Sequence, residues 1–218
     1  MSSEGKINIL VVGNGGREHA LVWKLLQSPR VNHIYVAPGN GGTSNLEKVT
    51  NIPIGSSKEE FNKLVEFAVK NSIELVIPGP EQPLVDGISK FFQKVGIPVF
   101  GPSESAARME GSKTFSKDFM KKYNIPTADY QNFTKYEEAY KYIENSKNNL
   151  VIKASGIAAG KGVLIPTNKQ EAFDAIKEIM VDRAFGSAGD EVVIEEFLEG
   201  DELSILCISD GYTILDLP

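Results

Sequence analysis

The fold is decided by one stretch of the sequence, Val151-Ile152-Lys153-Ala154-Ser155-Gly156-Ile157-Ala158-Ala159-Gly160-Lys161-Gly162. An apolar run ends at Lys153, and small residues connect it to a second apolar run. A Walker P-loop is excluded, because three residues separate Gly156 from Gly160, Gly162 replaces the hydroxyl residue, and a strand follows where a helix is needed. Small residues between two strands predict a mobile flap that can close over a triphosphate and exclude water. The alternative is an ordinary glycine-rich hairpin loop.

Upstream of this stretch, strands and helices alternate. We expect strands at residues 7–12, 34–37, 75–77 and 97–100, and helices at residues 17–27, 58–70 and 84–95. This alternation predicts a parallel sheet with helices on both faces, so the fold class is α/β.

The pattern changes after Pro102, where two helices at 103–109 and 112–123 follow without a strand between them. Further on we expect strands at 130–133, 150–153, 162–165 and 191–195, and helices at 136–143 and 169–180. Asp210-Gly211 predicts a hairpin turn between strands at 202–209 and 212–217. We place the domain boundary in the helical connector, between residues 101 and 124.

Three unusual loops follow predicted strands, at residues 13–16, 38–42 and 78–84. Loops at the carboxyl ends of parallel strands meet at one edge of the sheet, where ligands of such folds bind. A dinucleotide site is disfavoured, because Glu18 stands where the third glycine belongs and no acid ends the second strand. The loop at 13–16 is still expected to bind an anion through backbone amides, and a simple tight turn is the alternative.

Composition excludes several classes of protein. The 218 residues carry a net charge of -6, which argues against a nucleic-acid partner. No apolar run approaches the roughly 20 residues of a membrane span, so we expect no membrane partner and a cytoplasmic location. The single cysteine, Cys207, lies in an apolar run and is expected to be buried in a strand. No His and Cys pairs have metal-ligand spacing, so we expect no metal site within residues 1–218.

The order of the charged motifs points beyond each motif alone. Lys113 opens a predicted helix, Lys153 precedes the flap, and Glu195-Glu196 follow an apolar strand. Taken alone, the two acids are best interpreted as solvent-facing residues at a strand end.

In this order, the sequence resembles the glycinamide ribonucleotide synthetase (phosphoribosylamine–glycine ligase) family of the ATP-grasp superfamily, and the resemblance covers nearly the whole chain. The motifs that carry it are Val12-Gly13-Asn14-Gly15-Gly16-Arg17-Glu18-His19-Ala20, Val36-Ala37-Pro38-Gly39-Asn40, Gly79-Pro80-Glu81, Phe100-Gly101-Pro102, Glu110-Gly111-Ser112-Lys113, Ala159-Gly160-Lys161-Gly162 and Glu195-Glu196-Phe197-Leu198-Glu199-Gly200.

The resemblance implies a Rossmann-like domain at residues 1–102, then a partial ATP-grasp domain. The latter comprises a connector at 103–124, a flap subdomain at 125–195 and the start of a second subdomain at 196–218. It also implies an activity: ATP-dependent ligation of glycine to 5-phosphoribosylamine through glycyl phosphate, in purine biosynthesis.

Roles for individual residues also follow from the resemblance. The ATP-binding residues would be Lys113, Lys153, Ser155, Gly156, Gly160, Lys161, Gly162, Glu195, Glu196, Phe197, Leu198 and Glu202. Among them, Lys113 and Lys153 would contact phosphates, Glu195 the adenine amino group and Glu202 the ribose. The residues facing phosphoribosylamine or glycine would be Gly15, Gly16, Arg17, Asn40, Glu81 and Leu84.

The sequence departs from the family pattern in two ways. The family often has an acid where Ser155 stands, and its acidic Mg²⁺ ligands are expected beyond Pro218. We therefore expect the chain to be an inactive fragment, which in some eukaryotes belongs to a multifunctional enzyme. The alternatives are another ATP-grasp carboxylate–amine ligase, a biotin-carboxylase-like enzyme, or a non-catalytic nucleotide-binding module.

Overall fold

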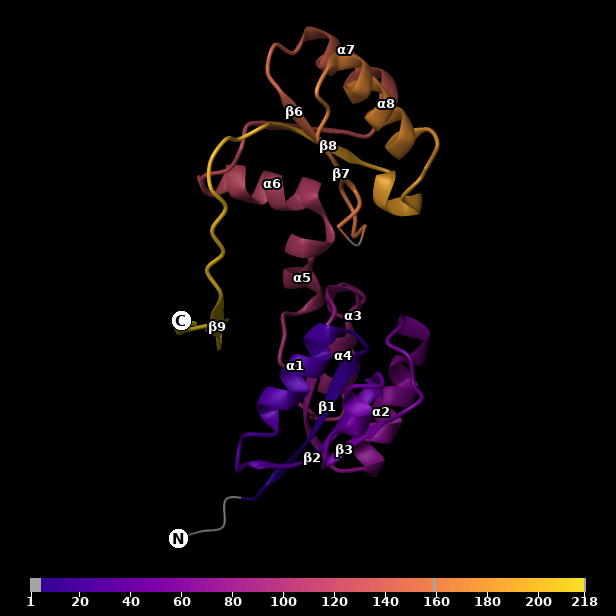
Figure 1. Ribbon diagram of the computed structural model, residues 1–218, viewed down its shortest axis with the longest axis vertical. Helices are drawn as coiled ribbons and strands as arrows, with labels where there is room; N and C mark the ends of the chain where they lie inside the picture. The colour runs from indigo at the N-terminus through magenta and orange to yellow at the C-terminus, as the bar shows by residue number, and fades with distance from the viewer. Residues whose placement is uncertain (1–4, 159, 218) are drawn as a thin grey trace.

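The computed structural model describes residues 5–158 and 160–217, which form two folded units and an extended terminal segment (Figure 1). The first unit has a four-stranded parallel sheet in the order β3-β2-β1-β4. Its strands are β1 (Ile7–Gly13), β2 (Val31–Pro38), β3 (Val49–Asn51) and β4 (Ile73–Pro78). The parallel sheet predicted from the alternating pattern is confirmed.

Both faces of this sheet are covered, because successive residues of a strand point to opposite sides. Leu10 and Val12 pack in one core with helices α2 (Phe61–Lys70) and α4 (Ile88–Gln93). Ile9 and Val11 pack in a second core with α1 (Gly16–Leu25). This arrangement explains why β1 is apolar at nearly every position.

The second unit has an antiparallel sheet in the order β5-β8-β6-β7. The strands are β5 (Tyr130–Phe133), β6 (Leu150–Ala154), β7 (Val163–Leu164) and β8 (Val192–Glu196). Helices α7 (Tyr136–Asn145) and α8 (Lys169–Met180) pack on one face, against Ile152 and Ile194. Helices α5 (Glu104–Gly111) and α6 (Lys113–Lys122) connect the two units, and α6 lies on the other side of the sheet (Figure 1).

Two expectations for the first unit were wrong, and three short elements were missed. The helix expected at 84–95 is two helices, α3 (Glu81–Val85) and α4, because Gly87 adopts a left-handed φ of 84° between them. The strand expected at 97–100 is reduced to a single bridge between Val76 and Val99. The short strand β3 and the 3-10 helices η1 (Thr43–Asn45) and η2 (Lys58–Glu60) carry no apolar periodicity that would reveal them.

The hairpin after residue 200 is confirmed but is shorter than expected, with β9 (Cys207–Ser209) paired to β10 (Ile214–Asp216). Its apolar side chains, such as Ile208 and Leu215, are exposed. Cys207 is exposed too, so the expectation of a buried cysteine was wrong. An apolar strand buries a side chain only where another element covers it, and no described element packs on this hairpin.

Candidate functional site

A lysine-rich cavity of about 240 Å³ lies between α6 and the sheet of the second unit. Its lining combines three lysines with apolar side chains, and comprises Met109, Glu110, Lys113, Ser116, Lys117, Met120, Lys153, Val163 and Val193. Lys153 is paired in register with Val163 and Val193 on the neighbouring strands, which places the three side chains on one face of the sheet. Cationic and apolar walls together suit a ligand with a flat apolar part and an anionic part.

The floor of the cavity is an ion-paired cluster. Glu195 on β8 is 3% exposed and pairs with Lys153 through one carboxylate oxygen and with Lys117 through the other. Burial lowers the pKa of Lys153 below its ordinary value, and the positive charges of Lys117 and Lys113 lower it further. Burial likewise lowers the pKa of Lys117 and of Lys113. The three lysines outnumber the two carboxylates of the cavity, buried Glu195 and the lining residue Glu110. The resulting excess of positive charge favours an anionic ligand.

The root of the flap is tied to the start of α6. The Ser155 hydroxyl is buried, accepts a hydrogen bond from the Thr114 amide at 3.2 Å and lies 3.0 Å from the Thr114 hydroxyl. Lys113 donates to the Ser155 carbonyl through its amide, at 2.8 Å, and to the Gly156 carbonyl through Nζ, at 3.0 Å. Two predicted site residues, Lys113 and Ser155, therefore meet, and the Ser155 hydroxyl is held by Thr114.

The amides at the flap root are already used. The Ser155 amide donates to the Glu191 carbonyl at 2.9 Å, and the Gly156 amide donates to the Ala188 carbonyl at 3.0 Å. A Cβ atom on Gly156 would lie 2.6 Å from Ala188 Cα, so this glycine is needed for the close approach. The amides of Ser155 and Gly156 are therefore not available to a ligand.

The tip of the flap is open. Gly160 has a left-handed φ of 76°, and a Cβ atom there would meet nothing within 4 Å. The Lys161 side chain is exposed, whereas Gly162 is buried and its carbonyl accepts from the Ala154 amide at 2.8 Å. Ala159 lies outside the described residues. The flap is therefore closed at its base, where Gly162 is buried, and accessible at its tip, where Gly160 has open space around it.

Of the predicted site residues between 195 and 202, only some lie near the cavity. Glu196 accepts from the Asp129 amide at 3.0 Å, and the Phe197 amide donates to the Asn149 carbonyl at 3.0 Å. The side chains of Phe197 and Leu198 are exposed. Glu202 is exposed in the extended segment, with no hydrogen bond or ion pair of its side chain to any described residue. The structure places Glu195 in the cluster and leaves Glu202 away from it.

The three loops of the first unit meet at the carboxyl edge of its sheet, as the sequence predicts. The Gly39 amide donates to the Gly13 carbonyl at 3.1 Å. Asn40 Nδ2 donates to the carbonyl oxygens of Asn14 and Gly15, at 3.0 and 3.1 Å. Across the same edge, helix α3 begins at Glu81, next to the loop that leaves β4. The edge is thus a connected polar network.

A carboxylate of the protein occupies the centre of this edge. Glu18 is 3% exposed, accepts from the Gly15 amide at 2.6 Å and pairs with Arg17 at 3.0 Å. Arg17 also pairs with Glu81 at 3.3 Å. The Gly15 amide, expected to face an anion, therefore binds Glu18 instead, while Gly16 has open space around it.

Leu84 does not join these loops. Its side chain packs against the first core, and a Cβ atom on Gly101 would lie 2.7 Å from Leu84 Cδ2. The structure therefore gives the Leu84 side chain a packing role, because α3 turns that residue toward the core.

Several residues of these sites were missed by sequence reasoning. Lys117 follows Lys113 by four residues, and that spacing places both on one helix face, so a signal was present. Glu18 stands at the third position of α1, where a glutamate reaches back to the helix start. Thr114 and Glu191, whose side chains are joined at 2.5 Å, carry no sequence signal.

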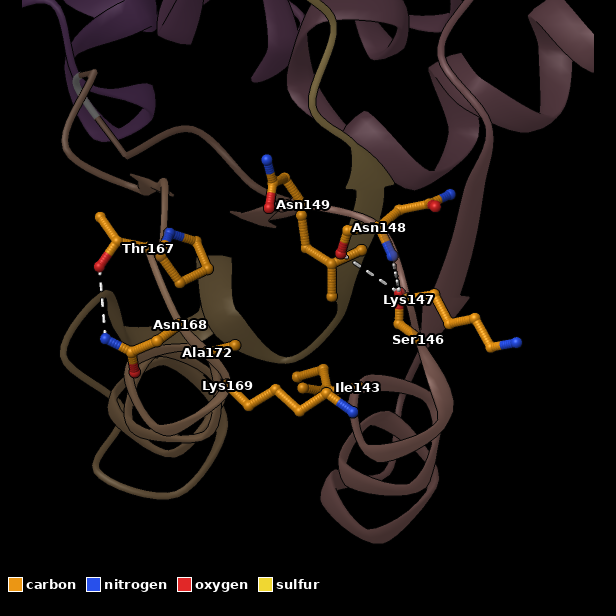
Figure 2. A pocket seen from close by; sticks show the side chains of 11 residues that line it. Ile143, Ser146, Lys147, Asn148, Asn149, Thr167, Asn168, Lys169 and Ala172 are labelled. Atoms are coloured by element: carbon orange, nitrogen blue, oxygen red, sulfur yellow. Dashed lines mark hydrogen bonds between the residues drawn. The ribbon is translucent and has the colours of Figure 1, made fainter.

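A second cavity, of about 160 Å³, lies between the end of α7 and the start of α8 (Figure 2). Its polar groups are committed locally, since Lys169 Nζ donates to the Glu144 carbonyl at 2.6 Å and Asn168 caps α8. No predicted site residue lines it, so it does not compete with the lysine-rich cavity.

Among residues 5–158 and 160–217, no group of three or more His, Cys, Asp or Glu side chains is placed to hold a metal ion. Within the same ranges, none of the helices has the length and apolar character required to cross a membrane.

Both units of the chain match models of known protein domains. The model of the phosphoribosylglycinamide synthetase N domain matches residues 7–110, and that of the ATP-grasp (A) domain of the same synthetase matches residues 111–218. The bifunctional purine biosynthetic protein PUR2,5 of Pichia angusta is 78% identical over 98% of this chain and 27% of its own length. A phosphoribosylamine–glycine ligase of Vibrio cholerae is 50% identical over 97% of this chain and 49% of its own length.

A solved structure agrees with these matches. The crystal structure of a phosphoribosylamine–glycine ligase from Thermotoga maritima superposes with a TM-score of 0.76 at 32% identity. It covers 97% of this chain and 49% of that one. The chain thus spans about a quarter to a half of the length of the relatives it matches. The two family models together account for nearly all of its residues, and the chain belongs to the phosphoribosylglycinamide synthetase family.

Proposed function

We propose that the full-length gene product joins glycine to 5-phosphoribosylamine, and that ATP is converted to ADP and phosphate in the reaction. The observation that carries this proposal is the lysine-rich cavity, which lies beside a glycine flap in a chain of this family. The small-molecule substrates ATP, glycine and 5-phosphoribosylamine are its partners, and the cytoplasm is where it works.

The chemistry explains why such a site is needed. The carboxylate of glycine is a poor electrophile, because its oxygens are poor leaving groups. Attack of a carboxylate oxygen on the γ-phosphorus of ATP releases ADP and forms glycyl phosphate. The amine of phosphoribosylamine then attacks the acyl carbon, and phosphate leaves. Catalysis of both steps depends on positioning and on neutralising phosphate charge.

Different residues in and beside the cavity contact different parts of the nucleotide. Lys113 and Lys153 neutralise phosphate oxygens, and the tip of the flap from Gly160 to Gly162 closes over them and excludes water. Backbone groups at Phe197 and Leu198 read the adenine ring, and the Glu195 carboxylate accepts a hydrogen bond from the adenine amino group. Glu202 reaches the ribose, which requires the extended segment to approach the cavity.

The loops of the first unit hold the remaining substrates. Arg17 and Glu81 offer a donor and an acceptor at the exposed side of this edge, which suits a ligand that carries an amine, hydroxyls and a phosphate. Asn40 positions the loops, because its side-chain amide donates to the Asn14 and Gly15 carbonyls and accepts from the Gly42 and Thr43 amides. Gly16, which has open space around it, lets a substrate approach the backbone closely, whereas the Gly15 amide is held by Glu18. Leu84 binds no substrate and packs against the core beneath these loops.

Mg²⁺ accompanies ATP in the reaction that we propose. The described residues do not fit a magnesium site, since they offer no suitable cluster of acids. We therefore assign no step to the metal within this chain, and its ligands are expected in the sequence that follows Pro218. The 218-residue chain alone is expected to be inactive for that reason, whether or not the gene product carries a second purine-pathway enzyme.

The domain division that accompanies this proposal places the N-terminal domain at 1–102, the connector at 103–124, the flap subdomain at 125–195 and the start of the second subdomain at 196–218. The family models change at residues 110 and 111, at the end of α5.

Two experiments test the proposal. ADP release, measured with a coupled assay, should depend on both glycine and phosphoribosylamine in the full-length protein and be absent from the 218-residue chain. Lys153→Ala should weaken ATP binding by about 1.5–3 kcal/mol, because it removes a charge-assisted contact with phosphate. The exposed lysine Lys141 on α7 is the matched control. Equal ATP affinity of Lys153→Ala and wild type would refute the assignment of Lys153.

A further inference from the structure

One carboxylate in the cavity is shared by two lysines that come from different elements. Glu195, on β8, pairs with Lys153 of β6 through Oε1 and with Lys117 of α6 through Oε2. The carboxylate is almost fully buried. A buried carboxylate needs a cationic partner at all times, because an unpaired charge in the interior is strongly destabilising.

The two lysines are not equivalent. The side chain of Lys117 is 10% exposed, and Nζ donates to Thr127 Oγ1 at 2.7 Å and to the Ala128 carbonyl at 3.4 Å. Nζ also lies 5.5 Å from the centre of the Tyr130 ring. The side chain of Lys153 is 28% exposed, and among the described residues its only recorded polar partner is Glu195. Lys117 is therefore held in place, whereas Lys153 can turn toward the cavity.

We infer that Lys117 is a positioning residue of this site, which keeps Glu195 paired while Lys153 leaves it to bind a nucleotide phosphate. The inference rests on the proposed function, since it takes ATP as the ligand of the cavity. It assigns Lys117 no contact with the nucleotide.

The physical reason is a competition for Lys153. With Lys117 present, Lys153 leaves behind a carboxylate that still has one cation. Without Lys117, an anionic ligand must pull Lys153 away from a buried carboxylate that has no other partner among the described residues. The cost of exposing that charge to its apolar surroundings would be subtracted from the binding free energy of ATP.

The test uses the full-length protein and measures the Kd of ATP by calorimetry. We expect Lys117→Met to weaken ATP binding by about tenfold or more. Lys117→Arg, which keeps the charge, should restore most of that loss. The matched control is Lys121→Met, one turn later on α6, where the lysine is exposed and should have less than about a twofold effect.

A second set of variants, made in a Glu195→Gln protein, separates a positioning role of Lys117 from a role in folding. In a Glu195→Gln protein there is no carboxylate to compensate, so adding Lys117→Met should change the ATP affinity by less than about twofold. This comparison remains available if Lys117→Met alone fails to fold, because the double variant removes both charges together. Thermal unfolding of each variant shows which proteins are folded.

The outcomes distinguish the two proposals. If wild-type protein does not bind ATP, the proposed function is overturned, and this inference falls with it. If wild type binds ATP and Lys117→Met binds equally well, only the inference is overturned. Equal losses from Lys117→Met with and without Glu195→Gln also overturn it.

Discussion

The two glycine-rich loops that follow β1 and β6 differ in how far the protein itself fills them. The loop at residues 13–16 is filled by the protein itself, since Glu18 binds the Gly15 amide and a Cβ atom on Gly13 would lie 2.7 Å from that side chain. The flap at residues 155–162 is closed at its root, but Gly160 at its tip has open space around it. The difference teaches that glycine spacing shows where the backbone can approach a ligand, whereas the neighbouring side chains decide whether the amides are free.

The largest expected effect comes from a methyl group added next to Glu18, in the loop that follows β4. A Cβ atom on Gly79 would lie 2.0 Å from Glu18 Oε1, and Glu18 is held by Gly15 and Arg17. Gly79→Ala should therefore lower the free energy of unfolding by about 2–3 kcal/mol, as overpacking of a tight site does. Urea unfolding of the 218-residue chain, followed by the fluorescence of its single tryptophan, measures this.

The control for that prediction is Gly41→Ala, where a Cβ atom would meet nothing within 4 Å. Its effect should stay below about 0.5 kcal/mol. If the two alanine variants are equally stable, Glu18 does not fill the loop as described.

The lysines beside the open flap should make the affinity for ATP depend on pH. Burial lowers the pKa of Lys113, Lys117 and Lys153 from the ordinary 10.5. Protonated lysines bind phosphate, so ATP affinity should be full at neutral pH and fall as pH rises, beginning below the range of an exposed lysine. The loss of one charge-assisted contact should cost about tenfold in Kd.

That profile is measured by titrating ATP into the full-length protein between pH 7 and pH 10. Lys153→Ala provides the comparison, because it removes one of the titrating groups and should flatten the alkaline loss. A constant affinity across this range would contradict the role of the lysines.

The smallest effect is expected at the root of the flap. Ser155→Ala removes the buried acceptor of the Thr114 amide and should lower the free energy of unfolding by about 1 kcal/mol. Ser187, an exposed serine in the 3-10 helix η3 (Gly186–Gly189), is the matched position for the same change. Equal stability of the two variants in urea would show that the Ser155 hydroxyl does not stabilise the flap root.

The elements that the sequence predicted best have strong local signals. Helix α8 was predicted with both ends correct, since Asn168 caps it and apolar residues recur at helical spacing. The break at Gly87 was missed, because glycine inside a helical pattern does not reveal its φ angle. The site was predicted in part: Lys113 and Lys153 do meet at one cavity, and Lys117 was overlooked because a lysine on a helix is usually solvent-exposed.

By itself, the sequence determined the parallel sheet, the two glycine loops and two of the three cations, Lys113 and Lys153, because periodicity and residue type act over short distances. Only the tertiary structure decided that Glu18 fills one loop and that Glu195 is shared by Lys117 and Lys153. The reason is electrostatic: whether a charge can be buried depends on which groups surround it in space, and β8 and α6 bring those groups together only when the chain is folded.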